Sequence, residues 1–359
     1  MIQPRSCLEA YDCPMRKLDM VAVVIPCHKV QSFILPLIEQ IGQEIDLIYV
    51  VDDACPHSTG QYVQEHCQDQ RVKVIFHHKN QGVGGAVISG YHQALQDGAS
   101  IIIKMDGDGQ MNPFLIPLLI SPIVGGKADY VKGNRFFDLN FLSTMPKIRV
   151  FGNAALSLIS KVCTGYWNIM DPTNGYTAIH ANILYLIPLH KLDKRYFFES
   201  DLLFRLSTVR AVVLDVPMRA KYDDEISSLR IGKVVWEFPN KYLTRLLKRI
   251  FYTYFLRDFN VGSVELVAGL FLITLGALYG GYNWYYSLTS KVIATSGTVM
   301  IAALPIILGF QLLLAAIHYD VMNVPKEPIY RFLKEHIAIN VNSDRTGNIQ
   351  NEENRINRE

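Results

Sequence analysis

Short apolar runs alternate with amphipathic stretches along the first half of the chain, and this alternation restricts the fold more than any other feature. The apolar runs predict buried strands at residues 20–25, 46–51, 71–76 and 99–105, and the first strand is expected to stop at Pro26. The amphipathic stretches predict helices at residues 31–45 and 60–68, and a third that ends near residue 97. Alternating strands and helices predict a doubly wound α/β domain with a mostly parallel sheet, in which ligands collect at the carboxyl ends of the strands.

Two aspartates follow the predicted strand at residues 99–105, in the stretch Met-Asp-Gly-Asp-Gly-Gln at residues 105–110. Asp106 and Asp108 flank a glycine at a strand end, so both carboxylates can turn toward one hard cation, and Gln110 can add a carbonyl oxygen. Mg²⁺ or Mn²⁺ held in this way keeps open positions for phosphate oxygens. The pattern predicts a metal–diphosphate site. A simple surface turn is the alternative, because Asp-Gly is also common in turns.

Polar residues also follow the neighbouring strands. Asp52 and Asp53 come directly after the strand at residues 46–51, where they can contact a ligand or cap the next helix. A glycine-rich run at residues 82–85 opens a helix and can cradle phosphate with backbone N–H groups. It lacks the spacing of a dinucleotide fingerprint, and no Walker phosphate loop is present. His77 and His78 are interpreted as polar loop residues.

Composition narrows the class of protein. The formal net charge of +2 argues against nucleic acid as a partner, which normally requires a basic domain or stripe. The six cysteines show no metal-binding or redox spacing. Residues 1–19, a predicted N-terminal extension, are charged throughout and lack the apolar core of a signal peptide, so the next domain is expected to be cytoplasmic. The hydrophobic content of 50% indicates that part of the chain lies in lipid.

The composition changes after about residue 231. Residues 232–260 interleave aromatic and basic side chains, which suits an amphipathic helix among lipid headgroups, although a helix packed on the sheet would also fit. Within residues 261–320, two apolar spans at about 264–286 and 292–318 are each long enough to cross a membrane. They predict a transmembrane hairpin with a connector at residues 287–291. Basic residues outside both spans place residues 20–231 and the tail, residues 321–359, in the cytoplasm, and the end of the tail is expected to be disordered.

Four motifs occur in the same order and at the same spacing as in a known family. They are Val24-Ile25-Pro26-Cys27-His28, Val50-Val51-Asp52-Asp53, Asn80-Gln81-Gly82-Val83-Gly84-Gly85-Ala86 and Met105-Asp106-Gly107-Asp108-Gly109-Gln110. With them the chain resembles family 2 glycosyltransferases, whose nucleotide-diphosphosugar-binding domain has a Rossmann-like GT-A fold. Within that family it most resembles the polyisoprenyl-phosphate glycosyltransferases, which include dolichyl-phosphate mannose synthase and bactoprenol glucosyltransferase. The resemblance covers about residues 21–318 and departs at His28, where the family usually has Asn or Tyr.

The resemblance implies a catalytic domain at residues 20–231 with distinct groups of site residues. The expected nucleotide-sugar contacts are Pro26, His28, Asp52, Asp53, Gly84, Asp106 and Gly107, and the expected metal ligands are Asp106, Asp108 and Gln110. The expected lipid-phosphate contacts are Arg135, Arg149 and Asn153, and residues 216–231 resemble an acceptor loop. The expected catalytic acids are Asp171, which acts as base or positions the acceptor, and the pair Glu199 and Asp201. Helix capping or salt bridging remains the alternative for these acids.

The implied activity is inverting, metal-dependent transfer of a sugar from a UDP- or GDP-sugar to a polyisoprenyl phosphate at the cytoplasmic face of a membrane, the inner membrane if the source is bacterial. The lipid-linked sugar would serve cell-envelope or glycoconjugate glycosylation. A phosphate acceptor is already anionic and needs less help from a base than a hydroxyl does. One alternative is a polysaccharide synthase, for which two spans are few. Another is a non-catalytic membrane scaffold, which would lack the metal carboxylates. A homo-oligomer is left open.

Overall fold

The computed structural model describes residues 20–137, 147–218 and 231–333, so the N-terminal extension, most of the expected acceptor loop and the end of the tail lie outside the described residues. The chain divides into two compact units. The sheet unit comprises the described parts of residues 1–160, 168–238 and 325–359, and the hairpin unit comprises residues 161–167 and 239–324.

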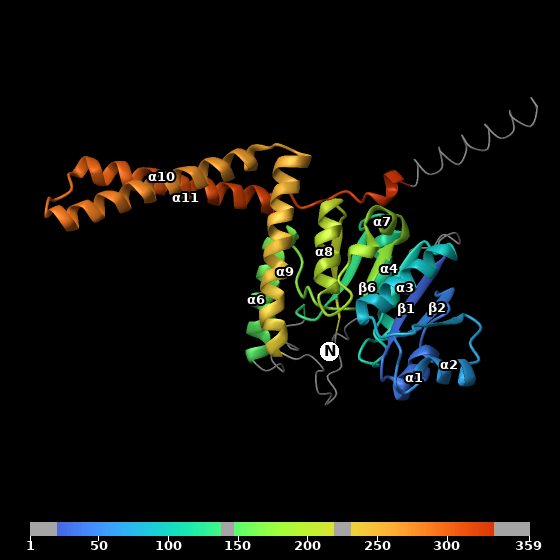
Figure 1. Cartoon of the computed structure of the whole chain (residues 1–359). Coiled ribbons are helices and arrows are strands. Elements are labelled where there is room, and N and C mark those ends of the chain that lie inside the picture. The colour runs from blue at the N-terminus through green and yellow to red at the C-terminus, as the bar shows by residue number, and fades with distance from the viewer. Residues whose placement is uncertain (1–19, 138–146, 219–230, 334–359) are drawn as a thin grey trace, which may run out of the picture. The chain divides into compact units, whose positions relative to one another are not determined.

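A seven-stranded sheet forms the centre of the sheet unit (Figure 1). Its strands, in spatial order, are β3 (Val72–Phe76), β2 (Leu47–Asp52), β1 (Val21–Cys27), β4 (Ile101–Lys104), β6 (Thr177–His180), β5 (Tyr130–Asn134) and β7 (Val213–Pro217). Neighbours pair in parallel except that β6 runs antiparallel to both β4 and β5. The prediction of a mostly parallel α/β sheet is confirmed. Because β6 is reversed, its beginning lies at the edge where the other strands end.

The prediction that the first strand stops at Pro26 is wrong, because β1 continues to Cys27. The carbonyls of Val21 and Cys27 accept backbone N–H groups from either end of β2, whereas the carbonyl of Val24 accepts one from the residue after β4. Backbone groups of alternate residues point to the same neighbour, so those of Pro26 face β4, as do those of Val24. The pairing of β1 with β4 ends at Val24 and Lys104. The missing N–H of Pro26 therefore interrupts no ladder bond, and proline is tolerated in a central strand.

Helices and short turns connect these strands along the chain. They are α1 (Gln31–Glu39), α2 (Thr59–His66), α3 (Val83–Gln96), α4 (Ile116–Val124), α6 (Lys147–Thr164), α7 (Ala181–Leu186) and α8 (Phe198–Thr208), with short 3-10 turns η1 (Pro113–Leu115) and η2 (Leu189–Lys191). Helix α3 packs on β1 and β2, and α4 packs on β4, β5, β6 and β7 (Figure 1). The main buried core combines the apolar residues of β1, β2 and β4 that the sequence pattern predicted to be buried with apolar residues of α1 and α4.

Helix α1 is shorter than the predicted helix at residues 31–45. It ends at Glu39, and the following turn contains Gly42, which is a poor helix former. The guanidinium of Arg71 donates to the carbonyls of Ile41, Gly42 and Ile45. These carbonyls are bound from outside the helix, so the chain can turn early without leaving buried acceptors unpaired.

A short segment that follows the hairpin returns to the sheet unit. The buried carboxylate of Asp129, just before β5, accepts the backbone N–H groups of Ile329 at 3.0 Å and Tyr330 at 2.8 Å. The ring of Tyr330 stacks on His180 with centroids 4.0 Å apart, and its hydroxyl donates to the carbonyl of Ile123. The sheet unit is therefore built from chain on both sides of the apolar hairpin. We call residues 329–330 the C-terminal strap.

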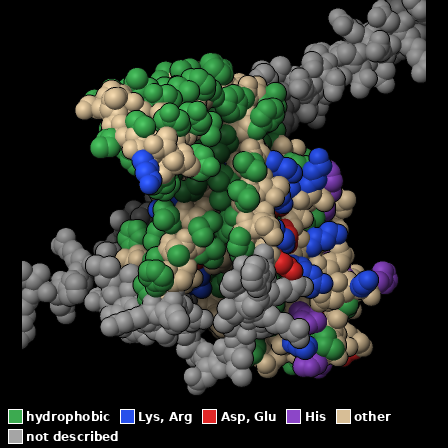
Figure 2. Space-filling view, turned by 60° about the vertical axis from the view of Figure 1, so that its left-hand side comes forward, with side chains coloured by type: hydrophobic (Ala, Val, Ile, Leu, Met, Phe, Trp, Pro, Cys, Tyr) green, Lys and Arg blue, Asp and Glu red, His purple; other side chains and the backbone are tan. Residues whose placement is uncertain are grey.

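The hairpin unit contains two long apolar helices, α10 (Val261–Ser290) and α11 (Ser296–Met322), which pack along each other. Both are long and apolar enough to cross a membrane, and Figure 2 shows hydrophobic side chains gathered over the hairpin surface. The connector begins at Lys291, later than predicted, because α10 runs to Ser290 and α11 starts at Ser296. Pro305 lies within α11.

Before the hairpin, α9 (Ile231–Phe251) and a π-helical segment (Tyr252–Arg257) cover most of the predicted amphipathic segment. Within the hairpin unit, Arg249 donates to both carboxylate oxygens of Asp320, at 2.8 and 3.0 Å. Tyr254 and Trp167 donate to the same carboxylate at 2.8 and 2.7 Å. These hydrogen bonds fix α9 to the end of α11, as expected for a buried charge that must be fully paired.

Candidate active site

A cavity of about 420 Å³ opens where β1, β2 and β4 end. Most of the expected nucleotide and metal residues line it, namely Pro26, His28, Asp53, Asp106, Gly107 and Asp108. The lining also contains residues that the sequence did not single out as site residues, among them Asn80, Val83, Arg195 and Tyr196. The carboxyl ends of parallel strands lie at one edge of the sheet, and this gathers residues from distant parts of the chain.

Asp52 and Asp53 have different environments. Asp52 does not line the cavity, because its buried carboxylate accepts the N–H groups of Cys55 at 2.7 Å and Gly60 at 2.6 Å and organises the turn into α2. Asp53 lines the cavity and accepts the N–H groups of Gln81 at 2.8 Å and Gly82 at 2.7 Å. Of this pair, only Asp53 is placed to contact a ligand in the cavity.

His77 also orients the carboxylate of Asp53. Its Nδ1 lies 2.7 Å from Asp53 Oδ1, and its Nε2 lies 2.8 Å from the hydroxyl of Ser89. The His77 side chain is only 6% exposed, so it is a buried contact of the site and not the polar loop residue that the sequence suggested. No local pattern could have shown this, because the contact depends on β2, β3 and α3 being neighbours.

A buried lysine holds the first aspartate of the Asp-Gly-Asp motif. Lys104 Nζ lies 2.9 Å from Asp106 Oδ1 and 2.8 Å from Glu199 Oε1. A Cβ on Gly175 would lie 2.2 Å from Lys104 Nζ and 2.8 Å from Asp106 Oδ2, so only glycine leaves room for this arrangement. Glu199, one of the expected catalytic acids, is thus a salt-bridge partner of Lys104.

The metal ligands proposed from the sequence separate in the structure. Asp106 and Asp108 both line the cavity, whereas Gln110 lines a second cavity of about 530 Å³. Lys104 holds Asp106 through Oδ1, and the Asp106 side chain is still 32% exposed. Two carboxylates that face a cavity large enough for phosphates fit Mg²⁺ or Mn²⁺, which binds proteins through one or two carboxylates plus substrate oxygens. Among the described residues, no cluster of three or more His, Cys, Asp or Glu side chains suits a metal held by protein alone.

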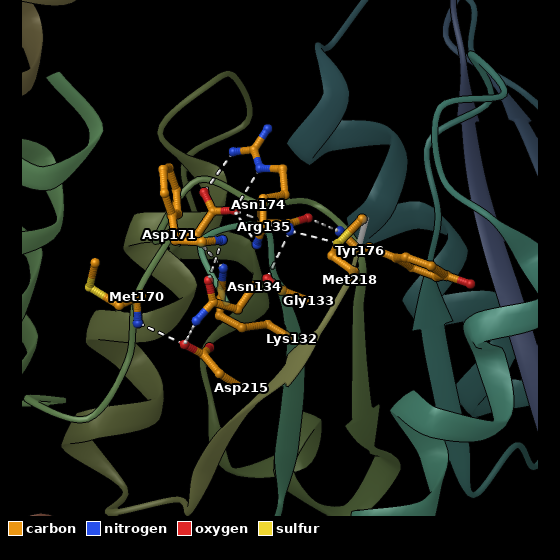
Figure 3. A network of polar contacts seen from close by, with 11 residues as sticks. Lys132, Gly133, Asn134, Arg135, Met170, Asp171, Asn174, Tyr176, Asp215 and Met218 are labelled. Atoms are coloured by element: carbon orange, nitrogen blue, oxygen red, sulfur yellow. Dashed lines mark hydrogen bonds and ion pairs between the residues drawn. The ribbon is translucent and has the colours of Figure 1, made fainter. Parts of the chain in front are cut away.

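A second polar network lies at the same edge of the sheet, around Asp171 (Figure 3). Arg135 Nε and Nη2 each donate to Asp171 at 2.6 Å, one to each carboxylate oxygen. Asp171 is only 1% exposed and has a left-handed backbone with φ of 52°. Lys132 Nζ donates to its carbonyl oxygen. The sequence assigned Arg135 and Asp171 to different roles, and the structure brings them together as an ion pair.

The network continues to Asp215 on β7. Asp215 Oδ2 accepts the N–H of Met170 at 2.7 Å and Asn134 Nδ2 at 3.1 Å, whereas Oδ1 is buried without a hydrogen bond. Burial raises the pKa of Asp215 to about 6, although the charge of Lys132 opposes this. For Asp171, burial also favours the neutral form, but the hydrogen bonds and charge of Arg135 prevail and lower its pKa. Burial lowers the pKa of Lys132.

The remaining expected site residues lie on α3, α6 and α8. Asp201 is buried on α8 and accepts the N–H of Asp193 at 2.9 Å. Gly84 is buried against residues 193 and 198 and does not line the cavity. Asn153 is half-buried on α6, and Arg149 lies on the same helix but its side chain is outside the described residues.

A mostly parallel sheet with two aspartates over a cavity at its carboxyl edge is the architecture of a GT-A glycosyltransferase domain. The family model for glycosyl transferase family 2 matches residues 22–186. The undecaprenyl-phosphate mannosyltransferase of Micrococcus luteus is 31% identical over 203 residues, which are 55% of this chain and 82% of that protein. The chain belongs to glycosyltransferase family 2.

Other relatives carry related names. The UDP-N-acetylglucosamine–dolichyl-phosphate N-acetylglucosaminyltransferase of Methanococcus voltae is 28% identical over 243 residues, 64% of this chain and 96% of that protein. The dolichol-phosphate mannosyltransferase of Pyrococcus furiosus is 26% identical over 233 residues, 64% of each chain. Among solved structures, glucosyl-3-phosphoglycerate synthase from Mycobacterium tuberculosis matches with a TM-score of 0.49 and 16% identity, over 64% of this chain and 79% of that one.

Proposed function

We propose that this protein is a membrane-anchored glycosyltransferase that moves a sugar, with inversion, from a nucleotide diphosphosugar to a polyisoprenyl phosphate. The observation that carries the proposal is the cavity at the end of β1, β2 and β4, which presents Asp53 together with Asp106 and Asp108. The names of the relatives from Micrococcus luteus, Methanococcus voltae and Pyrococcus furiosus support a polyprenyl phosphate as acceptor.

The cavity would hold the donor. Asp53, fixed by His77 and two backbone amides, would accept hydrogen bonds from the nucleoside, with Pro26 and His28 beside it. Asp106 and Asp108 would hold Mg²⁺ or Mn²⁺, which when bound neutralises charge on the leaving diphosphate. Lys104 and Glu199 keep Asp106 in place.

The network around Arg135 would receive the acceptor. Arg135 is 24% exposed, and its guanidinium, oriented by Asp171, carries a permanent positive charge that would attract the lipid phosphate. Asp171 is almost fully buried behind Arg135, so its contacts favour positioning of the guanidinium over direct proton transfer. Arg149 and Asn153 on α6 remain proposed partners of the same phosphate.

The hairpin would keep the enzyme at its lipid substrate. Both α10 and α11 are suited to cross a bilayer. Lysine and arginine residues are concentrated before α10 and after α11, with only Lys291 in the connector, which favours the sheet unit on the cytoplasmic side.

The full chain in lipid nanodiscs can be incubated with a panel of UDP- and GDP-sugars and a polyprenyl phosphate, and the products can be identified by mass. We expect a polyprenyl monophosphate sugar and a nucleoside diphosphate. A lipid diphosphate sugar with release of nucleoside monophosphate would contradict the proposal. So would a growing polysaccharide, or no lipid-linked product with any donor.

A further inference from the structure

The glycine-rich run at residues 82–85 serves a purpose that its sequence did not suggest. A Cβ on Gly82 would lie 2.5 Å from the carbonyl oxygen of Lys194, and a Cβ on Gly84 would lie 2.5 Å from that of Asp193. The N–H of Gly85, in the first turn of α3, donates to the Lys194 carbonyl at 3.1 Å. The glycines therefore allow the backbone of residues 193–194 to pack against the start of α3, and this contact occupies an amide that a phosphate would otherwise use.

The segment at residues 193–195 is also fixed from α8. The buried carboxylate of Asp201 accepts the N–H of Asp193 at 2.9 Å, and Arg205 donates both to Asp201 at 3.4 Å and to the carbonyl of Lys191. Asp193 in turn accepts the N–H of Arg195 at 2.9 Å. Asp201 is thus a positioning residue for this segment, and the segment has a defined place at the cavity wall.

This backbone position brings the side chain of Arg195 to the cavity. It lines the cavity together with Asp53, Asp106 and Asp108, and it is the only lysine or arginine among the described lining residues. Arg195 is exposed, and no carboxylate in the described part of the chain pairs with its guanidinium. A cation held without a partner beside acidic groups is suited to a ligand that is itself anionic.

We propose that Arg195 binds a phosphate oxygen of the donor diphosphate and stabilises the charge that develops there as the sugar–phosphate bond breaks. This inference rests on the proposed function for the identity of the donor as a nucleotide diphosphosugar. Arginine suits the task because its planar donor fork stays charged and fits phosphate oxygens. The backbone that carries Arg195 is fixed through Asp193 and Asp201, so the side chain lies at the cavity before the donor binds.

The test measures nucleotide binding separately from transfer. Calorimetry with Mn²⁺ and the full chain in detergent compares UDP and GDP with the corresponding nucleosides, for Arg195→Ala, Arg195→Lys and Lys194→Ala. Lys194 is the matched control, because it lies on the same segment but does not line the cavity. We expect Arg195→Ala to weaken the preferred diphosphate by about 10- to 100-fold, the range for hydrogen bonds between charged groups. Nucleoside affinity and the control should be unchanged, and Arg195→Lys should restore part of the loss.

Other outcomes would overturn the assignment. Equal losses in Arg195→Ala and Lys194→Ala would show a general charge effect. A raised KM for the lipid with unchanged diphosphate affinity would assign Arg195 to the acceptor. If the chain binds diphosphate through Arg195 but transfers nothing to a polyprenyl phosphate, the proposed function fails while the Arg195 contact stands. If the intact chain binds neither diphosphate, both fail.

Discussion

Arg135 and Asp171 form a bidentate ion pair, in which the guanidinium donates a hydrogen bond of 2.6 Å to each carboxylate oxygen. Asp171 is nearly fully buried, whereas Arg135 remains partly exposed. The pair can therefore act as one unit, in which the buried acid orients the guanidinium and the guanidinium meets the solvent or a ligand. This arrangement separates two effects of mutation, one on folding and one on acceptor binding.

The first prediction concerns this pair. Arg135→Ala leaves a buried carboxylate without its partner, which should lower the free energy of unfolding by up to about 3–5 kcal/mol. The double variant Arg135→Ala/Asp171→Asn removes the stranded charge, so it should recover part of the stability but none of the lipid affinity. Thermal unfolding and the KM for the polyprenyl phosphate measure the two effects. Recovery of lipid use in the double variant would show that Arg135 does not bind the acceptor.

The second prediction concerns the metal. Asp108→Asn should abolish transfer with little change in melting temperature, because Asp108 faces the cavity. Asp106→Asn should also abolish transfer. Binding of Mn²⁺, followed by its electron paramagnetic resonance signal in the presence of nucleoside diphosphate, should be lost in both. EDTA should stop turnover, and added Mg²⁺ or Mn²⁺ should restore it. Full turnover in chelator would exclude the proposed metal role.

The third prediction separates positioning from proton transfer at Glu199. Its carboxylate lies 2.8 Å from the buried amine of Lys104. Glu199→Gln keeps an acceptor for that amine but removes the charge, so stability should fall by about 1–3 kcal/mol while transfer changes only a few-fold. Lys104→Met should be worse, because it leaves two acids facing each other. Loss of transfer by Glu199→Gln of more than about 100-fold, the lower end of the range for general acid–base catalysis, would instead support a direct catalytic role.

The fourth prediction concerns pH. The pKa of Asp215 is raised from 3.8 to about 6, so the folded protein favours its neutral form. The stabilisation from this group is complete below the unfolded pKa and is lost as the pH rises through about 6. Asp215→Asn cannot ionise, so its stability relative to the unmodified protein should rise between about pH 4 and pH 7 by up to about 3 kcal/mol. Unfolding measured in detergent across this range tests the prediction, and a difference that does not change with pH would contradict it.

The fifth prediction concerns the C-terminal strap. A chain that ends near Ile231 lacks Tyr330, so Asp129 loses two of its N–H donors and His180 loses its stacking partner. We expect this truncated protein to melt earlier and to transfer to neither short nor long prenyl phosphates. Tyr330→Ala in the full chain should cost about 3–5 kcal/mol, as for other large aromatic side chains removed from a core. Equal stability and equal rates in truncated and full-length protein would refute both the structural role and a role of the membrane segment in catalysis.

Local sequence patterns determined the elements of this protein. The apolar runs predicted strands β1 to β4 and the two long helices, because burial along a strand or around a helix leaves a periodic record in the chain. The Asp-Gly-Asp motif directly follows the apolar run of β4, so it predicted acids at the end of that strand. The structure has Asp106 and Asp108 at the cavity. The boundaries were less accurate. Pro26 remains in its strand, and α1 ends early, before the turn whose carbonyls Arg71 binds.

Only the tertiary structure decided which side chains meet. The reversed strand β6 brings residues 171–176 to the edge where the parallel strands end, which allows Asp171 to reach Arg135 and Gly175 to make room for Lys104 and Asp106. The Asp53–His77 pair and the placement of Arg195 depend in the same way on contacts between elements far apart in sequence. A local pattern records which face of an element is buried, but the partner of a polar side chain is set by strand order and direction.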